Sequence, residues 1–193
     1  RRWREKVWCA ALDIEKAFDS VEREEIIKAL NNIGFNDRLI EVIANIYKAD
    51  VGLLYKDNRY IGRFTKTRGI KQGCKISPTL FNILINKVIK QVNTLYKLEE
   101  VNTLFYADDC LVLARNENDL RAKIKIIELE YKKLGLKINR NKSEILVFGG
   151  DDRDTILGLK RVEEIKYLGV TIKDTKNMLK GYIDNKILKA KKY

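Results

Sequence analysis

Two adjacent carboxylates, Asp108 and Asp109, stand between two short apolar runs, residues 103–107 and 110–114. Runs of this length around a polar dipeptide predict a β-hairpin, in which Asp could be an ordinary turn residue. A third carboxylate, Asp13, ends another apolar run near the start of the chain. Three carboxylates at strand ends repel one another unless a cation offsets their charge. Hard oxygen ligands of this kind suit Mg²⁺ or Mn²⁺, so the sequence predicts a divalent metal site.

The chain is strongly basic. Its 193 residues include 39 Lys and Arg against 27 Asp and Glu, which gives a net charge of +12. A charge of this size, spread along the chain, favours a polyanionic partner, most often nucleic acid, over a merely soluble basic protein. The sequence has no His and no Cys-x-x-Cys pair, which argues against a zinc site. The three cysteines, two of which lie in apolar runs, fit an intracellular, reducing location. No apolar run is long enough to span a membrane, so we expect no membrane partner.

Strand-like and helix-like patterns alternate along the chain. Periodicity and turn residues predict strands at residues 7–13, 51–55, 60–64, 143–148 and 165–172, and helices at 21–33, 37–47, 117–134 and 176–193. A further helix begins at Ser77-Pro78, with Ser77 as the expected N-cap. Asp19 and Glu22 have the spacing of a capping box for the helix at 21–33. We therefore expect one α+β fold, in which helices pack on one face of an antiparallel sheet.

Five sequence blocks occur in the order found in the palm of reverse transcriptases. They are residues 11–18, 68–82, 105–109 (Phe-Tyr-Ala-Asp-Asp), 135–143 and 167–169 (Tyr-Leu-Gly). In style the chain resembles the reverse transcriptases of non-LTR (LINE-type) retrotransposons. Group II intron enzymes also use a Tyr-Ala-Asp-Asp hairpin and are the first alternative. A palm co-opted only to bind nucleic acid is the second, although the intact set of three carboxylates argues against it.

The resemblance implies an RNA-directed DNA polymerase that transfers dNTPs to a primer 3′-OH with the help of two Mg²⁺ ions, or Mn²⁺ in their place. It assigns catalysis and metal binding to Asp13, the Ile14 carbonyl, Asp108, Asp109 and Lys142. It assigns nucleotide binding to Lys16, Ala17, Phe18, Gln72 and Gly73. It assigns contacts with the RNA template and DNA primer to Arg68, Lys71, Lys75, Tyr106, Tyr167, Leu168 and Gly169.

The resemblance also suggests roles for individual side chains. Phe18 stands where the family places a bulky residue beneath the incoming sugar, and a ring there would exclude a 2′-OH. The Gln72 amide can both donate and accept hydrogen bonds. Lys142 stands where the family has a lysine near the leaving pyrophosphate, where it could stabilise charge or donate a proton. Tyr106 is expected to pack under the hairpin and against the primer end.

The same comparison predicts the domain organisation. Residues 1–172 correspond to the palm, and residues 173–193 to the start of the thumb. The fingers motifs that precede the first block in the family are missing from this sequence. We therefore expect this piece to bind nucleic acid but to polymerise weakly or not at all on its own. A eukaryotic retroelement protein of this kind would act in the nucleus. The sequence predicts no particular oligomeric state.

Overall fold

A computed structural model of the chain describes residues 7–96 and 103–174, with the side chains of residues 95 and 96 left out. The helices are α1 (Ala17–Ser20), α2 (Arg23–Asn32), α3 (Asp37–Lys48), α4 (Ser77–Tyr96) and α5 (Glu117–Lys133). The strands are β1 (Val7–Leu12), β2 (Val51–Lys56), β3 (Arg59–Thr65), β4 (Thr103–Tyr106), β5 (Asp109–Ala114), β6 (Glu144–Phe148), β7 (Thr155–Ile156), β8 (Leu159–Arg161), β9 (Glu164–Tyr167) and β10 (Val170–Lys173). The predicted helix at 176–193 lies outside the described residues.

The chain forms two compact units. The first contains the described parts of 1–14, 92–129 and 138–193, and the second contains 15–91 and 130–137. In the described ranges, no helix is both long enough and apolar enough to cross a membrane.

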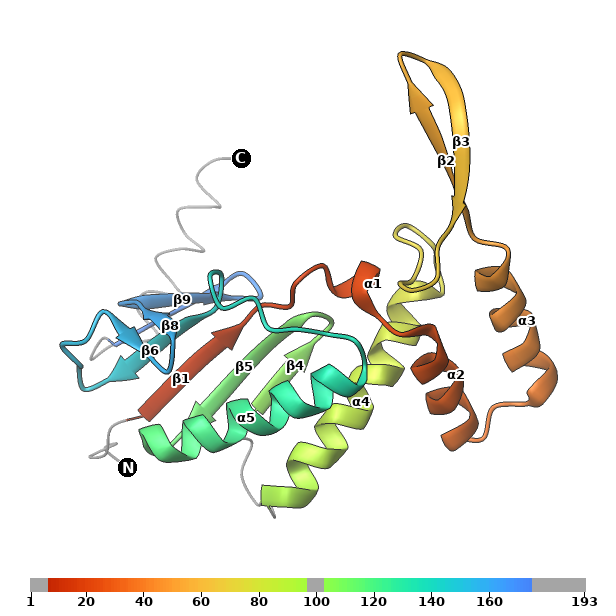
Figure 1. Cartoon of the computed structure of the whole chain (residues 1–193). Coiled ribbons are helices and arrows are strands. Elements are labelled where there is room, and N and C mark those ends of the chain that lie inside the picture. The colour runs from red at the N-terminus through yellow and green to blue at the C-terminus, as the bar shows by residue number, and fades with distance from the viewer. Residues whose placement is uncertain (1–6, 97–102, 175–193) are drawn as a thin grey trace, which may run out of the picture. The chain divides into compact units, whose positions relative to one another are not determined.

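The first unit is built on a six-stranded sheet in the order β4-β5-β1-β6-β8-β7 (Figure 1). β1 lies at its centre and pairs antiparallel with β5 and β6. The predicted α+β class and the antiparallel pairing of these strands are confirmed. One pairing departs from the prediction, because β6 and β8 run parallel. The short β7–β8 hairpin was not predicted from the sequence, and it adds this mixed edge.

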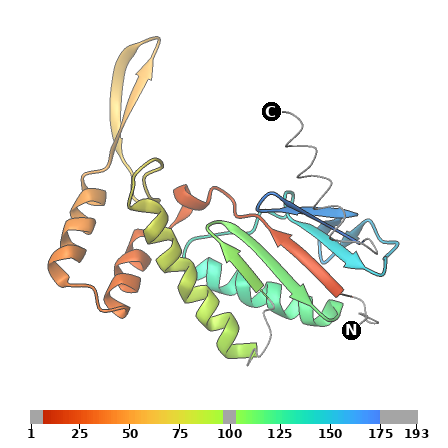
Figure 2. The same cartoon turned by 180° about the vertical axis from the view of Figure 1, so that it is seen from behind.

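Both faces of the central strands are covered. Successive residues of a strand point to opposite faces, so Cys9 faces one way and its neighbours Trp8 and Ala10 face the other. On the Cys9 face, the β9–β10 hairpin inserts Ile165 into a buried cluster with Leu111 and Leu146. On the opposite face lies α5, which runs across the strands in both views (Figures 1 and 2). The sheet thus carries a helix on one side and a hairpin on the other.

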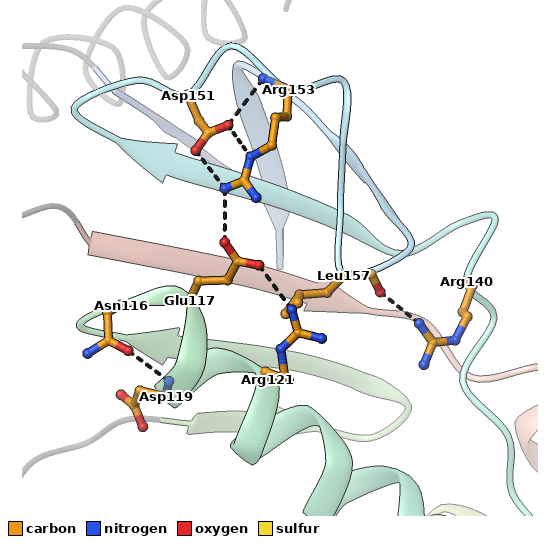
Figure 3. Close-up of polar contacts among 8 residues, drawn as sticks. All are labelled: Asn116, Glu117, Asp119, Arg121, Arg140, Asp151, Arg153 and Leu157. Carbon is orange, nitrogen blue, oxygen red and sulfur yellow. Dashed lines mark hydrogen bonds and ion pairs between the residues drawn. The ribbon is translucent and has the colours of Figure 1, made fainter.

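An ion network joins the start of α5 to the loop after β6 (Figure 3). The Arg153 guanidinium donates to Asp151 and to Glu117, and Glu117 also accepts from Arg121. These carboxylates raise the pKa of Arg153 further above its usual range. Arg153 also lies over the Trp8 ring, 5.8 Å from its centroid. Exposed pairs of this kind contribute only about 0–1 kcal/mol each, so the network orients the loop more than it stabilises the fold.

The second unit contains α1, α2, α3, the β2–β3 hairpin and the larger part of α4. Its centre is the Arg23 side chain, which donates to the carbonyls of Tyr47, Lys66 and Gly69 and to the Asp50 carboxylate. One residue of α2 therefore ties together the end of α3 and both sides of the loop that follows β3. Truncating it would leave several acceptors unpaired, and each unpaired buried acceptor costs about 1–3 kcal/mol.

Two predicted helix starts in this unit are wrong. The helix expected at 21–33 corresponds to α2, which begins later, at Arg23; a separate short helix that was not predicted, α1, precedes it, and between the two the Glu22 N–H donates to the Leu134 carbonyl. Asp19 lies within α1 and does not cap α2, whose N-cap residue Glu22 makes no side-chain capping bond. Ser77 is the first residue of α4 rather than its N-cap. Its buried hydroxyl lies 3.2 Å from the Tyr47 hydroxyl, which gives it a different partner.

The β2–β3 hairpin forms as predicted, around a two-residue turn. Asp57 and Asn58 both have positive φ, as a type I′ turn requires. Exposed large apolar side chains cover the hairpin: Val51, Leu53, Leu54, Tyr55, Tyr60, Ile61 and Phe64. An exposed apolar area of this kind usually marks an interaction surface.

Candidate active site

Strand register brings the three predicted metal-binding carboxylates to one end of the sheet. The β1–β5 ladder ends at the pair Leu12–Cys110, so Asp13 and Asp109 are the next residues on neighbouring strands. Asp108 belongs to the two-residue turn between β4 and β5. Burial raises the pKa of Asp109, and the nearby carboxylates of Asp108 and Asp13 raise it further. The charges of Asp108 and Asp13 therefore act on Asp109 at this edge of the sheet.

The donor set fits a hard divalent cation, because carboxylate repulsion is what such a cation relieves. In the part of the chain that the structure describes, however, no group of three or more His, Cys, Asp or Glu side chains is arranged to hold a metal ion. Asp108 is exposed and sits in a turn, so its side chain has room to rotate toward Asp13. The metal site therefore remains a prediction.

The backbone of Asp13 is held by residues that the sequence reasoning did not single out. The Asp13 N–H donates to the Ser143 hydroxyl at 3.0 Å, and the Asn139 N–H donates to the Asp13 carbonyl at 2.8 Å. The Ser143 hydroxyl in turn donates to the Asn139 carbonyl at 2.8 Å. Ser143 is fully buried. Both residues lie in the fourth sequence block, 135–143, which was the only signal that could have identified them.

The Ile14 carbonyl points in a direction that suits a metal ligand. Ile14 forms an antiparallel bridge with Ile138, and the flanking residues make the two backbone hydrogen bonds of that bridge. In this pattern the bridged residue turns its own N–H and C=O away from its partner. The bridge to Ile138 therefore leaves the Ile14 carbonyl turned away from the segment that contains Ile138.

The turn that carries Asp108 is conformationally strained. Ala107, its first residue, has φ of 51°, which is uncommon for a residue other than Gly, Asn or Asp. Strained backbone of this kind often occurs at functional sites. Tyr106 precedes the turn and is 63% exposed. The expectation that Tyr106 packs beneath the hairpin is therefore wrong. Its side chain is instead accessible to a bound nucleic acid.

The Tyr-Leu-Gly turn lies beside the acidic edge. Leu168 and Gly169 form the positive-φ turn of the β9–β10 hairpin, which has the type I′ pattern. Tyr167 packs against the Cys9 side of the sheet. Its pKa is raised by burial, and then by Cys110 and the Asp109 carboxylate. The structure thus brings the predicted primer-contacting turn close to Asp109.

Lys142 lies in the turn that leads to Ser143, and its side chain is exposed. Because Ser143 is bonded to the Asp13 backbone, the chain carries Lys142 to the same end of the sheet. Within the described ranges, no hydrogen bond or ion pair fixes its ammonium group against the carboxylates. Its assignment to the leaving pyrophosphate therefore remains a prediction.

The predicted nucleotide-binding residues lie in the second unit. The Phe18 ring stacks on Phe81 of α4, with 5.1 Å between ring centroids and an interplanar angle of 10°. Phe81 is fully buried, whereas Phe18 is only partly buried. One face of the Phe18 ring is thus backed by the core. Lys16 is exposed, at the left-handed N-cap of α1, and Ala17 is buried.

The loop before α4 is attached directly to the segment that contains Phe18. The Ile70 N–H donates to the Phe18 carbonyl at 2.7 Å, and the Gly69 N–H donates to the Val21 carbonyl at 2.7 Å. Gly69 has φ of +83°, and a Cβ there would lie 2.7 Å from the Asp19 carbonyl oxygen. Only glycine allows this approach. Gly73, to which the resemblance assigns nucleotide binding, has open space where a Cβ would stand, and the sequence did not single out Gly69.

The basic residues of this loop differ in their surroundings. Arg68 and Lys75 are exposed. The Lys71 ammonium lies 3.6 Å from the Asp50 carboxylate, which offsets part of its charge. Gln72 is exposed and donates through Nε2 to both Asp19 carboxylate oxygens, at 3.4 and 3.3 Å. Arg68 and Lys75 are therefore more open to solvent than Lys71, which is half-buried and paired with Asp50.

Comparison with known proteins agrees with this arrangement. The family model "Reverse transcriptase (RNA-dependent DNA polymerase)" matches residues 1–172. The Pol polyprotein of the type-1 retrotransposable element R2 of Nasonia vitripennis is 31% identical over 147 residues, which are 72% of this chain and 14% of that protein. The polyprotein of the type-2 element R2DM of Drosophila melanogaster is 26% identical over 187 residues, 87% of this chain and 18% of that protein.

Structural comparison leads to the same fold. Telomerase from Candida tropicalis, in complex with a fragment of telomeric RNA, superposes with a TM-score of 0.69 at 15% identity, covering 88% of this chain and 29% of that chain. The chain spans less than a fifth of the length of the two R2 polyproteins. The predicted resemblance to reverse transcriptases of non-LTR retrotransposons is confirmed. Members of the family generally use divalent metal ions. This chain therefore belongs to the reverse transcriptase family as a partial reverse transcriptase domain.

Proposed function

We propose that this chain supplies the catalytic carboxylates of an RNA-directed DNA polymerase encoded by a non-LTR-type retroelement. The observation that carries the proposal is the placement of Asp13, Asp108 and Asp109 at one edge of the sheet, where burial, and then the carboxylates of Asp108 and Asp13, raise the pKa of Asp109. An uncompensated acidic cluster is costly for a protein to keep. The matching family model makes nucleotidyl transfer the reaction that this cluster would serve.

The residues that would hold divalent ions are the three carboxylates and the Ile14 carbonyl. Two such ions, when bound, activate the primer 3′-OH and hold the triphosphate. Ser143 fixes the Asp13 backbone through a buried hydrogen bond, and this keeps the Asp13 carboxylate at the strand end. Asp108, in its exposed turn, completes the set by rotation. Lys142 stabilises charge on the leaving pyrophosphate or donates a proton to it.

The second unit contains the residues to which the family resemblance assigns nucleotide binding. The Phe18 ring stacks on Phe81, which restricts its motion. A fixed ring excludes a 2′-OH better than a mobile one. Gln72 and Gly73 contact the incoming nucleotide or the template base. Arg68 and Lys75, with the net charge of +12, attract the phosphates of an RNA template and a DNA primer. Tyr106 and the 167–169 turn contact the primer.

Primer extension on an RNA template tests this proposal with the full-length protein. We expect Mg²⁺-dependent incorporation of dNTPs, and a loss of about 10²- to 10³-fold in Asp13→Asn and Asp108→Asn, the scale on which one strong transition-state contact acts. Asp57→Asn is the matched control, because Asp57 lies in a type I′ turn where Asn is equally suited.

Two results would contradict the proposal. If the wild-type protein binds RNA and DNA but never extends a primer, the co-opted, binding-only alternative is correct. If Asp108→Asn extends primers as fast as Asp57→Asn does, polymerisation occurs without this carboxylate, and the catalytic assignment is wrong.

A further inference from the structure

Asp19 contacts the predicted nucleotide-binding loop through one side-chain interaction. The Gln72 Nε2 lies 3.4 and 3.3 Å from the two Asp19 carboxylate oxygens. A carboxylate accepts hydrogen bonds only, so the amide nitrogen rather than the amide oxygen of Gln72 must face it. Among the described residues, none donates a hydrogen bond to the Gln72 Oε1. Asp19 therefore fixes which end of the Gln72 amide remains available.

This contact is not what holds the loop in place. Two backbone hydrogen bonds of 2.7 Å join Gly69 and Ile70 to Val21 and Phe18. The Arg23 side chain holds the Gly69 carbonyl at 2.8 Å. The backbones of both segments are thus fixed without the Asp19 side chain. Both Asp19 and Gln72 are exposed, so the carboxylate contributes little to stability, and its effect falls on the orientation of one amide group.

We propose that Asp19 is a positioning residue, which presents the Gln72 amide oxygen to the incoming nucleotide. The inference rests on the proposed function, because it takes Gln72 as a nucleotide contact. It adds that the residue directly after Phe18 in the chain acts on the same nucleotide through Gln72. Phe18 and Asp19, which are adjacent in the chain, then both act on nucleotide binding. Phe18 excludes a 2′-OH, and Asp19 orients the Gln72 amide.

The proposal predicts a specific pattern in steady-state primer extension by the full-length protein. Asp19→Ala should raise the KM for dNTPs about 3- to 10-fold, the effect expected for one hydrogen bond of ordinary strength, and should leave kcat within about 2-fold, because the chemical step is untouched. Asp19→Asn should restore the KM, since the Asn side-chain oxygen can accept the same bond. Asp37→Ala, which removes an exposed Asp elsewhere in the second unit, is the control and should leave both constants unchanged.

A double-mutant cycle separates positioning from a merely structural role. If Asp19 acts only through Gln72, the double variant Asp19→Ala/Gln72→Ala should have the same KM as Gln72→Ala alone. Additive effects in the cycle, a KM for Asp19→Ala equal to that of the wild type, or failure of Asp19→Asn to restore the KM would each overturn the inference while leaving the proposed function intact. A wild-type protein without polymerase activity would instead refute the proposed function, and the inference with it.

Discussion

The Ser143→Ala substitution isolates the hydrogen bond that anchors Asp13. The Ser143 hydroxyl accepts from the Asp13 N–H at 3.0 Å and donates to the Asn139 carbonyl at 2.8 Å, and the side chain is fully buried. The Asn139 carbonyl also accepts from the backbone N–H groups of Lys142 and Ser143, so it stays satisfied in the variant. The Asp13 N–H loses its partner.

One orphaned buried donor costs about 1–3 kcal/mol of folding free energy. For a chain of this size, each kcal/mol shifts the melting temperature by about 2–4 °C, so we expect Ser143→Ala to melt about 2–12 °C lower. Ser20→Ala is the matched control. The Ser20 hydroxyl only donates, to the Glu15 carbonyl at 3.1 Å in a partly buried position, so its loss should cost less.

Thermal and urea unfolding, followed by circular dichroism, measures both variants. In the full-length protein, Ser143→Ala should also raise the Mg²⁺ concentration needed for half-maximal primer extension, because the Asp13 carboxylate is held less firmly. Ser143→Thr keeps a hydroxyl and should recover part of each effect. If Ser143→Ala is as stable as the wild type and has the same Mg²⁺ dependence, the anchoring role that we give to Ser143 is wrong.

Three further predictions concern the rest of the site. Asp109→Asn should raise the free energy of unfolding in metal-free buffer at pH 7 by on the order of 1 kcal/mol after solvent screening, and with it the melting temperature. The folded-state pKa of Asp109 is raised, so the ionised Asp109 carboxylate destabilises the wild-type protein. This destabilisation grows as the pH rises through the folded-state pKa and vanishes below the unfolded value of about 3.9. An unchanged melting temperature of Asp109→Asn at pH 7 would contradict this. Phe18→Ala should increase ribonucleotide incorporation in primer extension while dNTPs are still incorporated. An unchanged dNTP/rNTP ratio would show that Phe18 only packs in the core. Gly69→Ala should destabilise the second unit by about 1–3 kcal/mol, the cost of strained backbone, and wild-type stability in urea unfolding would show that the loop can move away from Asp19.

The features that the sequence predicted correctly depend on local patterns. The helix at 37–47 follows from apolar spacing, and α3 spans Asp37–Lys48. The hairpin around residues 57–58 follows from turn chemistry, and β2 and β3 pair around that turn. The acidic hairpin at 103–114 follows from two apolar runs around a polar pair, and β4 and β5 occupy those runs. In each case the residues that decide the structure lie within a few positions of one another.

The features that the sequence missed depend on contacts between distant segments. The break between α1 and α2 arises because the Glu22 N–H bonds to the Leu134 carbonyl, far along the chain. Asp19 has the spacing of a helix cap, but it meets Gln72 on another loop. Ser143 has no local feature that distinguishes it from an ordinary polar residue before a strand, and only the fold brings it to the Asp13 backbone. No local pattern records such pairings.

Metal binding at the sheet edge tests the central claim most directly. Mn²⁺ titration of the full-length protein, followed by the loss of the free-ion electron paramagnetic resonance signal, measures binding without requiring activity. We predict that the wild-type protein and the Asp57→Asn control bind Mn²⁺ alike, that Asp13→Asn and Asp108→Asn lose this binding, and that Mg²⁺ competes for the site. Equal Mn²⁺ binding by Asp108→Asn and the wild type would contradict the claim that these carboxylates form the metal site of a polymerase.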